Sequence, residues 1–242
     1  TALQSVADEY GLSLIEDTSQ AIGSAWQGAD GQWGAAATMG TIGTTSFLPP
    51  KNLGAYGDGG ACFTRDAALA ERLLMICNHG SRQPYLHEII GMNSRLDSIQ
   101  AAILGVKLPH LDGYNAARSD AADRYDALLG DHQMVSVPYR HPRSRHVFHQ
   151  YTIKLNNKGE GPGLRDHVAA HLQAEGVPFG IYYPKPIHQQ AAFSDVPGGT
   201  PELPVTEDLT DRVLSLPMHT ELTEPQQRRV VDAILGGLDS YI

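Results

Sequence analysis

A lysine and an aspartate in the first quarter of the chain have the types and settings that suit covalent chemistry on a carbonyl group. Lys51 follows two prolines and precedes a run of glycines, and the apolar side chains of Phe47, Leu48 and Leu53 indicate that it is partly buried. A lysine amine acts as a nucleophile when its surroundings lower its pKa or hold it against an aldehyde. Asp17 ends an apolar run, where a buried carboxylate requires a partner.

Each of the two residues also has a simpler interpretation. Taken alone, Lys51 fits a solvated surface lysine and Asp17 fits the N-cap of a helix. Together they fit the chemistry of pyridoxal 5′-phosphate (PLP), in which an acid keeps the pyridine nitrogen protonated and a lysine bonds the aldehyde. The pair therefore favours a PLP site more strongly than either residue does alone.

The elements that must position this pair follow an α/β order. A helix over residues 2–10 stops at Gly11, and the apolar run 12–15 is typical of a buried parallel strand. Ligands of such sheets bind at the carboxyl ends of the strands, which is where Asp17 lies. Further strands are predicted over 44–47 and 61–64, and further helices from Asp66 as N-cap to Cys77, over 94–107 and, beyond Pro109, over 111–129.

The second half of the chain has a different pattern of predicted elements. Strands are predicted over 148–155 and 179–183 and helices over 164–175 and 224–238, a mixture typical of a smaller α+β domain. The two predicted helices over 94–107 and 111–129 lie between these halves and are a natural place for a domain boundary. We therefore predict a domain boundary at residue 115, with a small C-terminal domain over 116–242.

The composition limits the classes of protein to consider. The 242 residues are 41% hydrophobic and carry a formal net charge of -9, which argues against a nucleic-acid or anionic-membrane surface. Two cysteines and the absence of a long apolar segment predict a cytoplasmic protein without disulfides that spans no membrane. The histidines lack metal-site spacing, so no metal is predicted. The glycine run 54–60 matches neither common nucleotide-binding pattern.

Four ordered motifs closely resemble the DegT/DnrJ/EryC1/StrS family of sugar aminotransferases. They are EDTSQAIG at 16–23, the stretch from TSF to GAYGDGG at 45–60, NHG at 78–80 and GMNSRLD at 91–97. The resemblance covers the whole chain. It implies the aspartate-aminotransferase-type fold (fold type I), with residues 1–115 as the C-terminal part of a large α/β/α PLP-binding domain and residues 116–242 as a smaller C-terminal α+β domain.

The resemblance also implies roles for five cofactor-binding residues. Lys51 would form the Schiff base with PLP, and Asp17 would pair with the pyridine nitrogen. Gln20 would lie beside the phenolic oxygen of the ring, and Ser46 would give its hydroxyl to the phosphate. Asn93 would reach the phosphate bound in a neighbouring subunit, which implies a homodimer with shared active sites.

Four further residues match family positions on the substrate side. Arg95 resembles a residue of members that handle sugar uronates, where a guanidinium suits a carboxylate. Its alternative is a helix-start arginine in a surface ion pair. Tyr182, Tyr183 and His188 match positions near the sugar nucleotide, and their alternatives are strand residues and a helix cap.

The expected activity is the amination of a nucleotide-linked keto sugar, with glutamate as the expected donor. Arg95 favours a UDP-linked 2-acetamido-3-keto hexuronate over a 3- or 4-keto deoxysugar. Two other functions stay open: a PLP-dependent sugar dehydratase, against which Lys51 counts because those members carry histidine there, and a non-catalytic PLP-fold interaction or structural module. The family's opening portion, which supplies a ring-stacking aromatic residue and amides for the phosphate, has no counterpart here, so the chain is expected to be a fragment.

Overall fold

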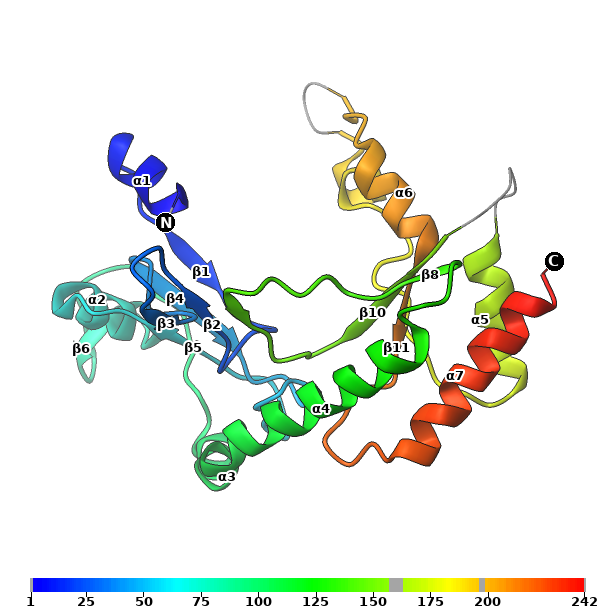
Figure 1. The fold of residues 1–242 in the computed structure, drawn as a ribbon. Coiled ribbons are helices and arrows are strands. Elements are labelled where there is room, and N and C mark those ends of the chain that lie inside the picture. The colour runs from blue at the N-terminus through cyan, green and yellow to red at the C-terminus, as the bar shows by residue number, and fades with distance from the viewer. Residues whose placement is uncertain (1, 157–162, 196–198, 242) are drawn as a thin grey trace. The chain divides into compact units, whose positions relative to one another are not determined.

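The computed structural model describes residues 2–156, 163–195 and 199–241, which fall into two compact units (Figure 1). The first unit comprises Thr1–Ala116 and Arg140–His149, and the second comprises Ala117–Tyr139 and Gln150–Ile242. We predicted a single boundary at residue 115. In the structure, however, residues 140–149 return to the first unit. That return matters for the site described below.

The main sheet of the first unit carries the Asp17 strand. It has the order β1-β4-β5, formed by Ile15–Asp17, Ile42–Ser46 and Gly60–Phe63. β1 runs parallel to β4, with Asp17 opposite Thr44, and β5 runs antiparallel to β4. The expectation of a buried strand over 12–15 is wrong: β1 begins at Ile15, whose side chain is 63% exposed. Within the described residues β1 pairs with one strand only, and the apolar residues Leu12 and Ile15 are both exposed.

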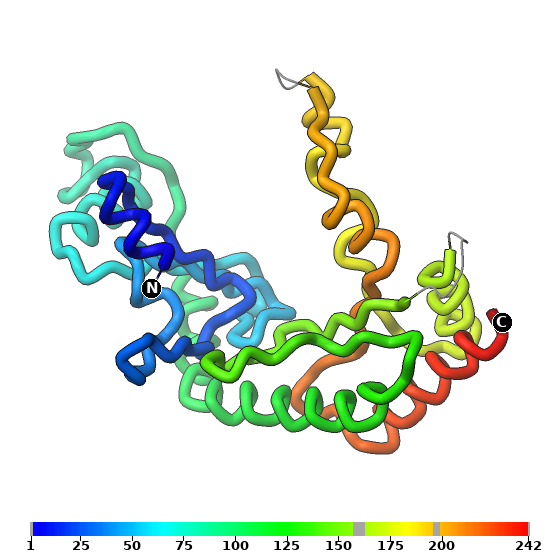
Figure 2. Tube along the Cα trace, turned by 45° about the horizontal axis from the view of Figure 1, so that its top comes forward, coloured from blue at the N-terminus to red at the C-terminus, as the bar shows by residue number. Residues whose placement is uncertain are grey.

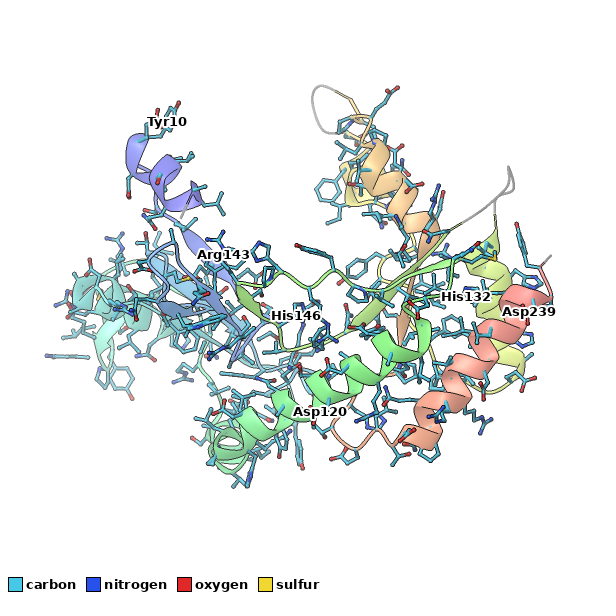
Figure 3. All side chains as sticks on the ribbon, in the orientation of Figure 1. Tyr10, Asp120, His132, Arg143, His146 and Asp239 are labelled. Carbon is cyan, nitrogen blue, oxygen red and sulfur yellow. The ribbon has the colours of Figure 1, made fainter. Side chains whose placement is uncertain are left out.

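A second, antiparallel sheet of the first unit was not predicted from the sequence. Its strands are β3 (Trp33–Ala35), β2 (Ala25–Gln27) and β9 (Ser144–Arg145), and the returning segment contributes β9. Each tryptophan lies under a guanidinium, Arg143 over Trp26 at 5.0 Å and Arg145 over Trp33 at 4.1 Å. Figure 3 labels Arg143 in this segment. These cation–π contacts bring the returning segment to the hairpin.

The helices of the first unit mostly follow their sequence signals. Asp66 accepts hydrogen bonds from the N–H groups of Ala68 and Leu69 (2.8 and 3.1 Å) and caps α2 (Ala67–Cys77), as predicted. The helix expected from residue 94 begins later, as α3 (Ser98–Lys107), because its N-cap, Asp97, has an extended backbone. The remaining elements are α1 (Ala2–Glu9), β6 (Ser81–Gln83), β7 (Leu86–His87), the 3-10 turn η1 (Leu108–His110) around Pro109, and α4 (Leu111–Leu129).

The second unit has one antiparallel sheet, with the order β11-β10-β8. The strands are Val213–Leu216, Tyr151–Leu155 and Val135–Ser136. Helices α5 (Leu164–Ala174) and α7 (Glu224–Asp239) pack side by side, as Figures 1 and 2 show. The other elements are η2 (Ile187–Gln189), η3 (Ala191–Phe193) and α6 (Pro204–Arg212).

Two strand predictions in the second unit need correction. The strand expected over 148–155 begins only at Tyr151, because the preceding residues belong to the first unit. The strand expected over 179–183 does not form. Gly180 makes a single bridge with Ser215, and a side chain at position 180 would collide with the Tyr182 ring, its Cβ 2.5 Å from a ring carbon. The chain therefore leaves the sheet after one residue pair.

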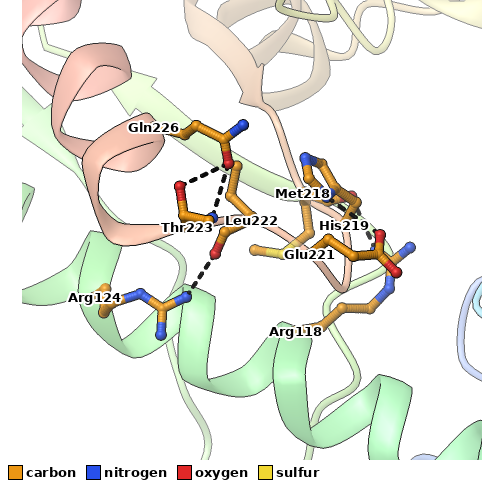
Figure 4. A network of polar contacts seen from close by, with 8 residues as sticks. All are labelled: Arg118, Arg124, Met218, His219, Glu221, Leu222, Thr223 and Gln226. Atoms are coloured by element: carbon orange, nitrogen blue, oxygen red, sulfur yellow. Dashed lines mark hydrogen bonds and ion pairs between the residues drawn. The ribbon is translucent and has the colours of Figure 1, made fainter.

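Two arginines of α4 hold the loop that follows β11 (Figure 4). Arg118 donates to the carbonyl of Met218 at 3.2 Å, and Arg124 donates to the carbonyl of Leu222 at 3.1 Å. Burial lowers the pKa of Arg118. Thr223, the residue after Leu222, begins the capping box of α7. The bond from Arg124 to Leu222 therefore fixes the start of α7 to α4 within this unit.

Candidate active site

Asp17 is held as an ionised carboxylate by its own neighbour in the chain. Its Oδ1 accepts hydrogen bonds from the hydroxyl (2.6 Å) and the backbone N–H (2.9 Å) of Ser19. These bonds, and more weakly the positive charge of Lys51, lower the pKa of the Asp17 carboxyl. Asp17 is exposed at the end of β1, and the residues after it form turns, so the helix-cap alternative is excluded.

The loop of Lys51 is anchored on both sides by apolar residues. Phe47 and Leu53 are 8% and 3% exposed and belong to one buried cluster, whereas Leu48 is exposed, contrary to expectation. The Lys51 N–H donates to the carbonyl of Leu48 at 2.9 Å, which closes a turn, and the lysine is half-buried. Lys51 is therefore less exposed than a fully solvated surface lysine.

Gly54 is required by close packing within this loop. A Cβ at this position would lie 2.1 Å from the carbonyl oxygen of Pro49, closer than any non-bonded contact allows. The Gly54 carbonyl accepts a hydrogen bond of 2.5 Å from Lys107 Nζ, and the next residue but one, Tyr56, donates its N–H to Gln100 (2.8 Å). Helix α3 thus fixes the part of the loop that follows Lys51.

Gln20 and Ser46 lie at the same edge of the sheet as Asp17. Asp17 and Ser46 end the parallel strands β1 and β4, and Gln20 is exposed in the turn after Asp17. Ser46 Oγ accepts the N–H of Leu48 at 3.2 Å. Asp17, Gln20 and Ser46 therefore follow or end neighbouring strands at one edge of the sheet, and Lys51 lies near enough to Asp17 to affect its charge.

Asn93 and Arg95 form a separate feature of the first unit. Asn93 is exposed and makes a bridge with Asn78, and its Oδ1 accepts a hydrogen bond from Arg95 Nε at 3.3 Å. Arg95 lines an open cavity of about 860 Å³ beside β5, whose lining includes neither Asp17 nor Lys51. The helix-start alternative for Arg95 fails, because α3 begins three residues later.

The other substrate-side candidates lie in the second unit and are described there by themselves. The rings of Tyr182 and Tyr183 meet edge to face with centroids 5.8 Å apart, and both side chains are exposed. His188 is half-buried and lies in η2, where its Nε2 is 3.0 Å from Glu207 Oε1. The N–H of Leu203 and the His188 bond lower the pKa of the Glu207 carboxyl. Because that carboxylate is ionised, Nε2 carries the proton of their hydrogen bond.

A model of the DegT/DnrJ/EryC1/StrS aminotransferase family matches residues 1–235. The chain belongs to this family. It is similar to UDP-N-acetyl-3-dehydro-alpha-D-glucosamine 3-aminotransferase of Acidithiobacillus ferrooxidans, with 44% identity over 96% of this chain and 59% of the relative. It is also 38% identical to UDP-2-acetamido-2-deoxy-3-oxo-D-glucuronate aminotransferase of Pseudomonas aeruginosa, over 91% of this chain and 57% of the relative.

A solved structure shows the same fold. The structure of S. venezuelae DesV in complex with ketimine intermediate has a TM-score of 0.86 and 39% identity, covering 96% of this chain and 60% of DesV. This likeness confirms the predicted fold class. The chain spans less than two thirds of the length of each of these relatives.

Sequence reasoning missed several residues that support the site in this family member. Ser19 holds Asp17, Glu207 holds His188, and Asn52 and Asn115 connect the loop of Lys51 to its surroundings. Adjacency was the available signal for Ser19 and Asn52, which lie two residues and one residue from a candidate. Nothing local marks Asn115 or Glu207.

The described ranges show neither a metal-ligand cluster nor a membrane-crossing helix. There, His, Cys, Asp and Glu side chains form no group of three or more that could hold a metal ion. Of the helices in those ranges, none has the length and apolar character that a bilayer crossing requires.

Proposed function

We propose that the whole protein is a PLP-dependent aminotransferase that converts a nucleotide-linked keto sugar to an amino sugar, with glutamate as the donor. The observation that carries this proposal is the ionised Asp17 carboxylate at a strand end, within electrostatic reach of the half-buried Lys51. Aminotransferases of this family are PLP-dependent. The relatives named above are aminotransferases of nucleotide-linked sugars.

The residues of the first unit fit PLP in two observable ways. Both bonds from Ser19 go to Oδ1 of Asp17, so among the described residues Oδ2 accepts none and is open to a ring N–H. Ser46 Oγ accepts a hydrogen bond from Leu48, which leaves its hydroxyl proton for an acceptor such as a phosphate oxygen. Asp17 and Ser46 end neighbouring strands, so one ligand can meet both.

The cofactor and the residues around it would have separate chemical roles. PLP supplies an aldehyde that bonds amines and a protonated ring that accepts electron density. Asp17 keeps the ring nitrogen protonated because its own pKa is low. Gln20 would lie beside the phenolic oxygen, and Ser46 would bind the phosphate. The Lys51 amine would bond the aldehyde and, as a free amine, would serve as general base and acid at the substrate carbon.

Absorption spectra of the full-length protein given PLP test this proposal. We expect a visible band of lysine-bound PLP, and borohydride reduction should fix PLP on the peptide that contains Lys51. Lys51→Ala and Lys51→Arg should both abolish the band and the adduct, and Lys51→Arg keeps the positive charge near Asp17. Lys154→Arg, in the second unit, is the control and should leave both unchanged. A band of equal intensity in wild type and the Lys51 variants would refute the proposal.

For the substrate we propose a UDP-linked 2-acetamido-3-keto hexose, in particular the hexuronate. Both relatives named above act, by name, on UDP-linked sugars oxidised at C3, and they differ in whether the sugar carries a carboxylate. Arg95 supports the uronate, because its guanidinium lines an open cavity and has Asn93 as its hydrogen-bond partner. A guanidinium recognises a carboxylate through two parallel hydrogen bonds.

A comparison of the two keto sugars in a glutamate-consumption assay tests this choice. Arg95→Ala should lower kcat/KM for the uronate by roughly 10-fold to 100-fold, the loss expected for a charge-assisted hydrogen bond of about 1.5–3 kcal/mol. The same variant should leave the uncharged sugar nearly unaffected. Equal losses on both sugars would show that Arg95 does not read the carboxylate.

We also propose that Tyr182, Tyr183 and His188 contact the sugar nucleotide and that Asn93 completes the phosphate site of a partner subunit in a homodimer. The exposed positions of the two tyrosines and of Asn93 support these assignments. Light scattering of the full-length protein should give the mass of two chains. A monomer that binds PLP with full affinity would contradict the shared site. A cytoplasmic location, expected from the composition, stays a prediction.

A further inference from the structure

Asn52, the residue directly after Lys51, reaches two distant parts of the first unit with one amide group. Its Nδ2 donates to Asn115 Oδ1 in α4 at 2.7 Å and to the carbonyl of Val147 in the returning segment at 2.8 Å. The side chain is buried, with 7% of the residue exposed. Both protons of the amide are therefore committed to acceptors away from solvent.

The orientation of this amide is fixed by its partners. If the group were turned over, Oδ1 would face the oxygens of Asn115 and Val147, and two hydrogen bonds would become two repulsive contacts. In the observed orientation Oδ1 is buried and has no hydrogen-bond partner in the described residues. A buried unpaired acceptor costs free energy, so a residue that only filled space would be better apolar. The amide is explained by what its NH₂ group holds.

Asn115 passes the connection on to the segment that follows Asp17. Its Nδ2 donates to the carbonyl of Ile22 at 3.1 Å. The adjacent Gly23 makes room for this contact, because a Cβ there would lie 2.4 Å from Asn115 Nδ2. Ile22 lies in the turns over residues 19–23, which begin after Asp17 and include Gln20.

We propose that Asn52 and Asn115 form an amide relay that sets the position of Lys51 relative to Asp17 and Gln20. The relay rests on the proposed function and makes both asparagines positioning residues for it. The apolar cluster of Phe47 and Leu53, against which Ile22 packs, and the bond from Lys107 hold the loop down, but neither provides a directional hydrogen-bonded connection to the Asp17 segment. The relay makes that connection, and small errors there matter because a misplacement of about 1 Å can cost roughly 100-fold in rate.

Two variants act on the two ends of the relay in the full-length protein. Asn115→Asp keeps an acceptor for Asn52 but replaces the donor to Ile22 with a carboxylate oxygen, so it breaks a single link. Asn52→Ala removes the hydrogen bonds from Asn52 to Asn115 and to Val147. Asn156→Ala is the matched control, because Asn156 Nδ2 also makes side-chain and backbone bonds, to Ser136 at 2.9 Å and Gln133 at 3.4 Å, but in the second unit.

The readout is the rate at which Lys51 captures PLP, followed by borohydride trapping and peptide mass spectrometry, beside the melting temperature of the PLP-free protein. We expect both relay variants to capture PLP between about 10-fold and 100-fold more slowly, with the band of bound PLP titrating at a shifted pH. Asn156→Ala should capture PLP at the wild-type rate even if its melting temperature falls equally. Wild-type rates and an unshifted titration in the folded relay variants would overturn the relay. Failure of the wild type to capture PLP at Lys51 would instead refute the proposed function.

Discussion

Ser19 gives both its hydroxyl and its backbone N–H to a single oxygen of Asp17, at 2.6 and 2.9 Å. These two hydrogen bonds from a residue two positions away favour the ionised carboxylate and fix its orientation. The other oxygen, Oδ2, stays open to a ligand. This arrangement combines a low pKa with an available acceptor, which is what a partner for a protonated ring nitrogen needs.

Ser19→Ala should raise the pKa of Asp17, because it removes the bond that contributes most to the lowering. A carboxyl whose pKa is lowered in the folded protein favours folding and ligand binding above its ordinary pKa and loses that contribution as the pH falls through the lowered value. The acid limb of PLP binding should therefore move to higher pH in Ser19→Ala. A carboxylate NMR titration of Asp17 measures the shift directly. Ser19→Thr keeps the hydroxyl and should behave as wild type, and an unmoved titration in Ser19→Ala would contradict the assignment.

Gly54→Ala should destabilise the first unit, since the new Cβ would lie 2.1 Å from the Pro49 carbonyl oxygen. The backbone must shift to relieve this contact, at a cost of about 1–3 kcal/mol. Gly113→Ala is the control, because Gly113 lies within α4 and a Cβ there meets nothing within 4 Å. That change should raise the free energy of unfolding by about 0.5–1 kcal/mol. Denaturant titrations that give the two variants the same sign would disprove the packing argument.

His188 should carry its proton on Nε2 when the imidazole is neutral, because that nitrogen faces the ionised Glu207 at 3.0 Å. Nitrogen-detected NMR of the ring distinguishes the two tautomers. In Glu207→Ala the preference should weaken, whereas His219, which lies 3.8 Å from Glu221, should show the same spectrum in both proteins. An Nδ1-protonated ring in the wild type would contradict the pairing.

Gln227→Leu should destabilise the second unit although it replaces a polar side chain by an apolar one of similar size. Gln227 is fully buried, donates to the Ala121 carbonyl at 2.7 Å and accepts a hydrogen bond from Arg124. The substitution removes both hydrogen bonds and leaves the Arg124 Nε–H without its acceptor, at a cost of about 1–3 kcal/mol for that group. Gln226→Leu, one residue earlier at an exposed position, removes the capping-box partner of Thr223 and should cost less. Equal losses in urea titrations would refute the buried role.

The sequence by itself predicted most of the helices, several of the strands and the candidate pair Asp17 and Lys51. Local signals are strong where a cap or a stop is present, as at Asp66, whose side chain closes α2 as predicted. The motifs around Asp17 and Lys51 are also local, and they were sufficient to predict the family to which the chain belongs. These features depend only on residues that are neighbours in the sequence, so they can be predicted without knowledge of the fold.

Tertiary structure alone decided what supports that pair. Val147 and Asn115 lie far from Asn52 in the sequence, and only the return of residues 140–149 to the first unit brings Val147 within 2.8 Å of it. The exposure of Ile15 and the failed strand at Gly180 have the same origin, because burial and pairing depend on neighbours that composition does not specify. Periodicity and spacing describe a residue's own segment, whereas hydrogen-bond partners come from the packing of segments that the chain brings together.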